Sequence, residues 1–299
     1  MKLSVVICTY NRTKLLRGSI ETACNALLRL MDNSYELLVI DNNSSDETAI
    51  VVKDFQKKFE FIKYVFEPNQ GLSYARNRGI NESRGDIIAF IDDDVKVHPD
   101  WAVNLLKYFE DPEVMCVGGR IFPWWEVPPP KWLTQDFWGP IALLDHGEKP
   151  KIMPNTHLWG ANLSFRKKVF EKYGFFDVNL GRKGKYLLSG EETRFLSELI
   201  RNNEKVIYAP DVIVWHFVPK ERMKRTYFLK WKFYNGISCV LVDDLPVKRT
   251  FLSVPLYFYR YLLLNILRVI KEPSFKNLLL VCDNMGRIYG ARLKYKLCS

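Results

Sequence analysis

The feature that most constrains this chain is a series of short, predominantly apolar runs separated by segments with helical spacing. The runs have the length of strands and no polar alternation, which is typical of strands buried on both faces of a sheet. The segments between them repeat apolar residues at helical spacing, as Leu16, Ile20, Ala23 and Leu27 do. This alternation predicts an α/β domain with a mostly parallel central sheet and helices on both faces. The strand candidates are residues 3–8, 35–40, 61–66, 87–91 and 114–121, and the helix candidates are residues 15–30, 45–58, 72–83 and 101–109.

Polar residues follow three of these runs directly. They read TYNR at residues 9–12, DNNSSD at residues 41–46 and DDD at residues 92–94. Ligands of open α/β sheets bind outside the carboxyl ends of the strands, so we expect the functional site there. The chain contains neither G-x-G-x-x-G nor G-x-x-x-x-G-K-[ST], which disfavours a nicotinamide-type dinucleotide site and a P-loop.

The acidic triplet is the strongest candidate for chemistry. Strand alternation places Asp92 and Asp94 on the same side. Carboxylates crowded at a strand end repel one another unless a cation neutralises them, and Mg²⁺ or Mn²⁺ usually binds one or two carboxylates together with substrate phosphates. The alternative is a solvated acidic loop. Asp41 ends a neighbouring strand and could accept a hydrogen bond from a base or a ribose, or serve as a turn residue.

Two further positions have competing interpretations. Ser189 and Glu192 have the spacing of a helix capping box before the helix candidate at residues 193–201. Glu192 or Glu191 could instead act as a general base toward a hydroxyl nucleophile. His216 follows the apolar residues 212–215 and is either a packed histidine or a ligand of a cation held by the carboxylates.

The regular pattern loosens over residues 123–185. The segment 124–132 contains three tryptophans and three consecutive prolines, which argue against a regular helix or a central strand. Such a loop either packs against the body of the protein or stacks on a sugar. Residues 206–208 and 212–214 are expected to form two short strands, and beyond His216 the pattern is helical and aromatic.

Charge is distributed unevenly along the chain. Residues 1–216 hold 28 Lys and Arg against 29 Asp and Glu, whereas residues 217–299 hold 16 against 5. Within this basic segment, residues 255–271 form an amphipathic helix that places Arg260, Arg268 and Lys271 in one sector. The helix either docks on an anionic membrane surface or packs on the protein or a second copy. Nucleic acid is not expected, since no binding motif accompanies the charge.

No run of about 18 uncharged apolar residues occurs, so a membrane-spanning helix is not expected. The first residues have too short an apolar core for a signal peptide. We therefore expect a cytoplasmic protein, which would contact the inner face of the membrane if the basic segment docks there rather than packing on the protein or a second copy.

Taken together and in order, these motifs resemble the family 2 glycosyltransferases of the GT-A fold. The resemblance covers about residues 1–240 and is specific because seven weak motifs occur in the right order. They are VVICTYNR (5–12), VIDNNSSD (39–46), NQGLSYARNRG (69–79), GDIIAFIDDD (85–94), WGANLSFR (159–166), GFFD (174–177) and GEE (190–192).

The resemblance also implies roles by position. It assigns the nucleotide-sugar to Thr9, Tyr10, Arg12, Asp41, Arg76, Asp92 and Asp93, the metal to Asp94 and His216, and the sugar or acceptor to Trp159 and Asn162. Glu192 stands where the family usually has an aspartate as catalytic base. Because glutamate is one methylene longer, Glu191 stays a second candidate for that role.

The implied reaction is an inverting, Mn²⁺- or Mg²⁺-assisted transfer from a UDP- or GDP-sugar to a glycan or lipid-linked acceptor, as in polysaccharide synthesis. The alternatives are a nucleotidyltransferase and a carbohydrate-binding or assembly subunit with impaired catalysis. We divide the chain into a catalytic domain at residues 1–217, with a nucleotide-sugar half (1–122) and an acceptor half (123–217), and a helical extension at residues 218–299.

Overall fold

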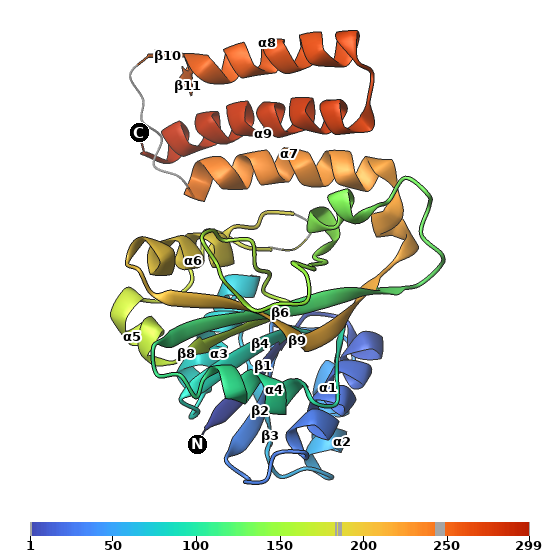
Figure 1. The fold of residues 1–299 in the computed structure, drawn as a ribbon, viewed down its shortest axis with the longest axis vertical. Coiled ribbons are helices and arrows are strands. Elements are labelled where there is room, and N and C mark those ends of the chain that lie inside the picture. Colours follow the sequence, from blue (N-terminus) through green and yellow to red (C-terminus); the bar gives the residue numbers. More distant parts are fainter. Residues whose placement is uncertain (1, 183, 185–186, 243–248, 299) are drawn as a thin grey trace.

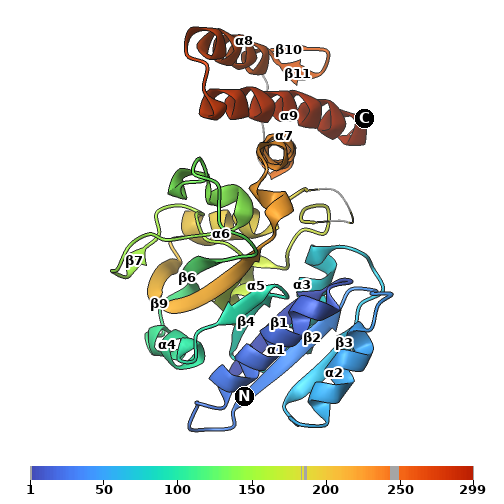
Figure 2. The same cartoon turned by 90° about the vertical axis from the view of Figure 1, so that its right-hand side faces the viewer.

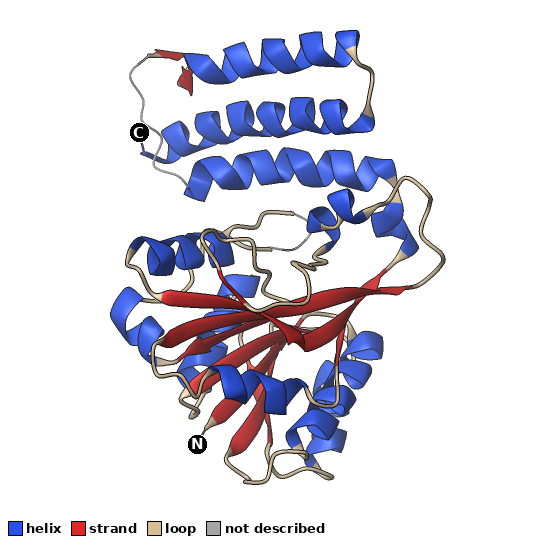
Figure 3. Cartoon of the chain, in the orientation of Figure 1, coloured by secondary structure: helices blue, strands red, loops and turns tan. Residues whose placement is uncertain are grey.

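The structure, a computed structural model, describes residues 2–182, 184, 187–242 and 249–298. A central sheet has the strand order β3-β2-β1-β4-β8-β6-β9-β5, with β7 paired to β9, and helices lie on both of its faces (Figures 1 and 3). Its strands are β1 (Leu3–Thr9), β2 (Tyr35–Asp41), β3 (Ile62–Phe66), β4 (Ile87–Asp92), β5 (Val95–Val97), β6 (Val114–Trp125), β7 (Lys151–Ile152), β8 (Asn162–Arg166) and β9 (Lys205–Val218). The α-helices are α1 (Thr13–Leu27), α2 (Thr48–Gln56), α3 (Leu72–Glu82), α4 (Trp101–Tyr108), α5 (Lys168–Tyr173), α6 (Glu191–Arg201), α7 (Arg225–Val242), α8 (Leu256–Lys271) and α9 (Phe275–Cys298). Short 3₁₀ turns are η1 (Gln135–Phe137), η2 (Gly139–Ile141) and η3 (Lys220–Met223), and β10 (Thr250–Phe251) pairs with β11 (Val254–Pro255) outside the main sheet.

The first half of the sheet confirms the alternation of strand and helix. Strands β3, β2, β1 and β4 are parallel neighbours, and their ends differ from the predicted ones by one residue or none. The second half is mixed, because β8 runs antiparallel between β4 and β6, and β5 runs antiparallel to β9. The parallel arrangement therefore brings the carboxyl ends of β1, β2 and β4 to one edge.

Strands β6 and β9 correct two predictions. Trp124 and Trp125 continue β6, so the strand runs past the predicted end at residue 121. This end of β6 pairs with β9 alone, as β8 contacts only Cys116–Gly118, so it avoids the constraints of a central strand. The two short strands expected at residues 206–208 and 212–214 are one strand, β9, with a register irregularity opposite Gly119 and Arg120.

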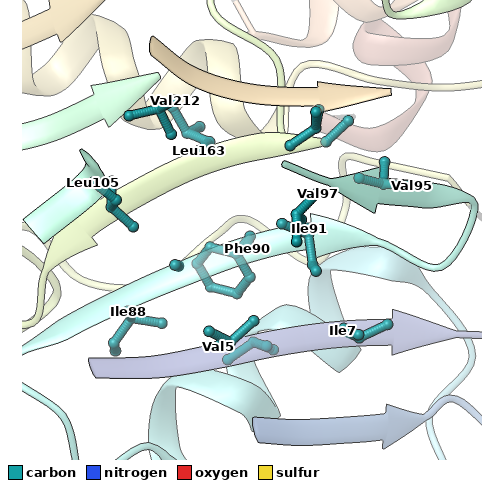
Figure 4. Packing of buried hydrophobic residues seen from close by; sticks show 14 of the residues in the cluster. Val5, Ile7, Ile88, Phe90, Ile91, Val95, Val97, Leu105, Leu163 and Val212 are labelled. Carbon is teal, nitrogen blue, oxygen red and sulfur yellow. The ribbon is translucent and has the colours of Figure 1, made fainter. Parts of the chain in front are cut away.

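Apolar side chains of the strands form one core. Figure 4 shows Val5 and Ile7 of β1 beside Phe90 of β4, with Leu163 of β8 and Val212 of β9 farther across the sheet. All five are buried. This packing explains why the runs are predominantly apolar before they reach the carboxyl edge. The buried polar residues Ser4 and Glu36 are exceptions, and the Ser4 hydroxyl donates to Glu36 Oε1 at 2.7 Å.

The tryptophans of segment 124–132 pack on the protein body. The Trp124 ring lies 5.1 Å from that of Phe217 in an edge-to-face arrangement, and the Lys96 ammonium lies 3.8 Å from its centroid. Trp132 packs against Phe228 and Phe275 at centroid distances of 5.1 and 5.3 Å. Of the two interpretations of this loop, the structure supports packing for both tryptophans.

Helices α7, α9 and α8 form a layer above the sheet domain, in that order outward (Figures 1 and 2). Helices α7 and α9 approach closely through glycines, since a Cβ on Gly236 would lie 2.1 Å from the Asp283 carbonyl oxygen. Phe258 of α8 is buried in a small cluster with Val240 of α7 and Ala291 of α9. Among the described residues, no helix has both the length and the apolar character needed to cross a membrane.

Candidate active site

A cavity of about 500 Å³ opens at the carboxyl ends of β1, β2 and β4, and α7 contributes to its wall. The structure brings most of the predicted site residues to this cavity. Those that line it are Thr9, Tyr10, Arg12, Arg76, Asp92, Asp93, Asp94, Trp159, Glu191, Glu192 and His216. A larger cleft, of about 1000 Å³ between α6 and the helical layer, shares only Glu191 with it and lacks the acidic strand end.

Asp92, Asp94 and His216 form a cluster suited to a divalent cation. One potential ligand atom from each residue lies within 4.8 Å of the others. Antiparallel pairing of Val95 with His216 sets the histidine beside the acidic loop, where its Nε2 lies 3.2 Å from Asp94 Oδ1. The other ring nitrogen, His216 Nδ1, is buried without a hydrogen-bond partner. Buried polar atoms are rarely left unpaired, so these residues fit a bound Mg²⁺ or Mn²⁺.

Arg12 and Thr9 hold the rest of the acidic loop. Arg12 Nη1 donates to Asp93 Oδ1 at 2.9 Å and to Asp94 Oδ2 at 2.8 Å, and Thr9 Oγ1 donates to Asp93 Oδ2 at 2.8 Å. Burial raises the pKa of Asp93 to about 6 despite the nearby Arg12. Burial would also raise the pKa of Asp94, but His216 and Arg12 together hold it below its usual range. Asp94 therefore stays ionised, and Asp93 takes up a proton more readily than an ordinary aspartate.

Arg76 connects the acidic strand end to the glutamate pair. From α3, its Nη1 lies 2.9 Å from Oε1 of both Glu191 and Glu192, and its Nη2 lies 3.7 Å from Asp92 Oδ1. The guanidinium is 3% exposed and lies against the rings of Phe90 and Phe176. A buried arginine in this position can fix the two glutamate side chains at hydrogen-bond distance and attract Asp92 by its charge.

The two glutamates occupy different environments. The side chain of Glu191 is 2% exposed and that of Glu192 is 18% exposed. Burial and the charge of Glu192 raise the pKa of Glu191 to about 8. Burial acts in the same direction on Glu192, but Arg76 outweighs it and lowers the pKa of this carboxyl. At neutral pH, Glu191 is therefore mainly protonated and Glu192 is a carboxylate that reaches the cavity.

The capping-box interpretation of Glu192 is wrong. Helix α6 begins after Gly190, which has a φ of +107°, and no side chain caps it; the Ser189 amide donates instead to Ser238 Oγ at 3.0 Å. Gly160 makes room for the glutamate, since a Cβ there would lie 2.2 Å from both Glu192 Oε1 and Arg76 Nη2.

Two predicted residues are not among those that line the cavity. Asn162 is 1% exposed, accepts from Trp101 Nε1 at 3.0 Å and donates to the carbonyl oxygens of Arg120 and Val212 at 3.1 and 2.8 Å. These bonds use its amide to join strands, which is a structural role. Asp41 is buried as well, and accepts from the Tyr64 hydroxyl and the Ser44 amide, both at 2.8 Å.

Sequence reasoning missed the part of the wall that comes from the C-terminal segment. Arg222 of η3 and Tyr227, Trp231 and Asn235 of α7 line the cavity. Arg222 Nη1 lies 3.9 Å from Asp94 Oδ2. The spacing of 227, 231 and 235 follows one face of a helix, which was a readable signal, but only the fold shows that this face turns toward the acidic loop.

This combination of fold and site is that of the GT-A class of glycosyltransferases, which confirms the predicted fold. The profile of glycosyl transferase family 2 matches residues 4–174, and the chain belongs to this family. It is 28% identical over 245 residues to a glucosyl-dolichyl phosphate glucuronosyltransferase of Haloferax volcanii, covering 81% of this chain and 78% of the relative. It is 33% identical over 257 residues to the glycosyltransferase AglE of the same organism, covering 83% and 77%.

A solved structure extends the likeness of the fold to almost the whole chain. The mannosyltransferase PcManGT from Pyrobaculum calidifontis, in complex with GDP-Man and Mn²⁺, matches with a TM-score of 0.66 at 14% identity. The match covers 99% of this chain and 88% of that one. The protein is thus a glycosyltransferase whose structural neighbour binds a nucleotide-sugar with Mn²⁺.

Proposed function

We propose that this protein transfers a sugar from a nucleotide-diphosphate sugar to an acceptor hydroxyl in one displacement that inverts the anomeric configuration. The observation that carries the proposal is the position of Arg76, which contacts both the carboxylate at the metal cluster and the glutamate pair. One cavity thus holds a site for a leaving diphosphate and a base for the incoming hydroxyl.

Glu192 is the general base in this mechanism. Arg76 keeps Glu192 ionised and oriented, and Gly160 leaves room for its longer side chain. Its carboxylate takes the proton of the acceptor hydroxyl while the hydroxyl oxygen bonds to the anomeric carbon. The bond from that carbon to the diphosphate oxygen breaks on the opposite face, and the nucleoside diphosphate leaves with the bonding electron pair.

Asp92, Asp94 and His216 would hold Mn²⁺ or Mg²⁺, with Arg222 near the same place. When bound, the cation supplies Lewis-acid stabilisation of the charge that develops on the leaving diphosphate. Arg12 neutralises Asp93 and Asp94 and so holds the loop together, while Thr9 and Tyr10 border the nucleotide in this proposal. We propose Mn²⁺ or Mg²⁺ as the metal and UDP or GDP as the nucleotide of the donor.

The acceptor in this proposal is a lipid-linked glycan or a growing glycan chain. Trp159, Tyr227 and Trp231 line the cavity and offer ring faces for sugar stacking. The Haloferax volcanii relative is named for a lipid-linked sugar, glucosyl-dolichyl phosphate, which supports this class of acceptor. A cytoplasmic location at the inner face of the membrane is part of the proposal.

The test is a panel of nucleotide-sugars offered with lipid-linked sugars, in which nucleoside diphosphate release and product configuration are measured. We expect release from one donor, in step with product of inverted configuration. Pyrophosphate release would indicate a nucleotidyltransferase, and donor binding without release would indicate a binding or assembly subunit. A product with retained configuration would contradict the single displacement.

A further inference from the structure

Helix α8 exposes an unusual amount of apolar surface. It is the outermost element of the helical layer, and α9 covers only its inner side (Figures 1 and 2). Phe258 is buried against α9, but the side chains of Leu263, Leu267 and Ile270 are 59%, 51% and 71% exposed. Leu256, Tyr261, Leu264 and Ile266 are exposed as well. Scattered exposed apolar residues need no explanation, whereas a contiguous set on one helix marks an interaction surface.

The exposed apolar residues and the exposed basic residues of α8 lie at different angles around the helix. At 100° per residue, Leu256, Leu263, Ile266, Leu267 and Ile270 fall within a sector of about 100°. We call these five residues the outer strip. Beside the strip lie Arg260, Lys271 and, farther round, Arg268, all exposed. Helix α8 contains no acidic residue between Leu256 and Lys271.

We propose that α8 lies flat on an anionic lipid bilayer, with the outer strip among the acyl chains and its basic residues at the headgroups. The charges favour this occupant, because residues 217–299 hold 16 Lys and Arg against 5 Asp and Glu. A helix lying in the interface has an apolar face and a basic flank, as α8 has. Tyr257, Tyr259 and Tyr261 near its start suit the same depth, where aromatic rings with a polar end collect.

A second copy of the chain fits this face less well. A symmetric contact between two outer strips would bring Arg260 and Lys271 of each copy toward the same residues of the other, without an acidic residue on α8 to neutralise them. Anionic lipid supplies that missing charge. Docking by α8 is independent of the proposed transfer reaction, because vesicle binding is measured without donor or acceptor.

Flotation of the full chain with phosphatidylcholine vesicles, with and without about 30% phosphatidylglycerol, tests the proposal. We expect binding to the anionic vesicles, weakened by salt, and little binding to the neutral ones. Replacing Leu263, Leu267 and Ile270 together by Ser should reduce binding more than tenfold. Ile50→Ser is the matched control, since Ile50 is 61% exposed on α2 of the sheet domain.

A charge variant separates the electrostatic contribution to vesicle binding from the apolar contribution of the outer strip. Arg268→Gln with Lys271→Gln should reduce binding to anionic vesicles by roughly 25-fold, at about fivefold per charge, and lessen the salt dependence. Circular dichroism verifies that each variant is folded. Absence of flotation at low salt, or unchanged flotation of the triple Ser variant, would overturn the proposal. A wild-type dimer that the Ser variant converts to monomers, with vesicle binding unchanged, would instead assign the strip to a second copy.

Discussion

Replacing Glu191 by Gln should stabilise the protein, and increasingly so as the pH rises. Glu191, the first residue of α6, is buried beside Arg76 and Glu192, and its Oε2 has no hydrogen-bond partner. The folded state therefore favours the protonated acid, which an amide imitates in size and lack of charge. Ionisation of Glu191 must instead place a second negative charge beside Glu192.

The size of the effect follows from the two pKa values of Glu191. The carboxyl has a pKa of about 8 in the folded protein and 4.5 as its ordinary value. Below 4.5 it is protonated in both states; between the two values the folded state binds more protons, so the free energy of unfolding falls as the pH rises. At about 1.4 kcal/mol per pH unit, the loss reaches several kcal/mol by pH 9. In Glu191→Gln no group ionises at this position, so the free energy of unfolding does not fall for this reason.

Urea unfolding of both proteins at pH 5, 7 and 9 measures the difference. The advantage of Glu191→Gln should be under about 1 kcal/mol at pH 5 and grow to about 3–5 kcal/mol at pH 9. Glu198→Gln, an exposed change on the same helix, controls for amide substitution in α6. An advantage of the same size at pH 5 and pH 9 would refute the assignment of Glu191 as a buried acid.

Three further changes address the site. Gly160→Ala should lower kcat by roughly 10–100-fold, because its Cβ would collide with the Arg76 guanidinium, whereas Gly18→Ala on α1 should leave kcat unchanged. Chelation should abolish transfer and Mn²⁺ or Mg²⁺ restore it, and Asp94→Asn should cost on the order of a hundredfold in rate; full activity of Asp94→Ala in chelator would contradict the cation site. Trp231→Ala should raise KM for the acceptor and not for the donor, and the reverse pattern would contradict its role in acceptor binding.

Local patterns predicted the nucleotide-binding half of the fold well. Strands β1, β2 and β4 are buried on both faces, so predominantly apolar runs in the sequence mark them, and the polar residue that ends each strand marks the edge where the site lies. From the strand ends alone, the sequence correctly predicted that Thr9, Arg12 and Asp92–Asp94 lie at the same site. The family resemblance added Arg76 and the glutamate pair, which no local spacing could connect.

The rest depends on contacts between distant segments. The pairing that extends β6 to Trp125 comes from β9, some 90 residues later in the chain, and no local pattern shows it. Asn162 belongs to the motif at residues 159–166, yet its side-chain amide donates to backbone carbonyl oxygens of β6 and β9. The domain boundary predicted at residue 217 assigned α7 to a separate extension. No motif in α7 indicates that this helix lines the cavity.

The central claim is that the Glu192 carboxylate is the base of a transfer reaction in this cavity. The most direct measurement compares wild type and Glu192→Gln in single-turnover transfer at saturating donor, together with donor affinity and melting temperature. We predict unchanged donor affinity and a transfer rate lower by about 10²–10⁴ in the variant, with a smaller loss for Glu191→Gln. A normal transfer rate per folded Glu192→Gln molecule would contradict the account.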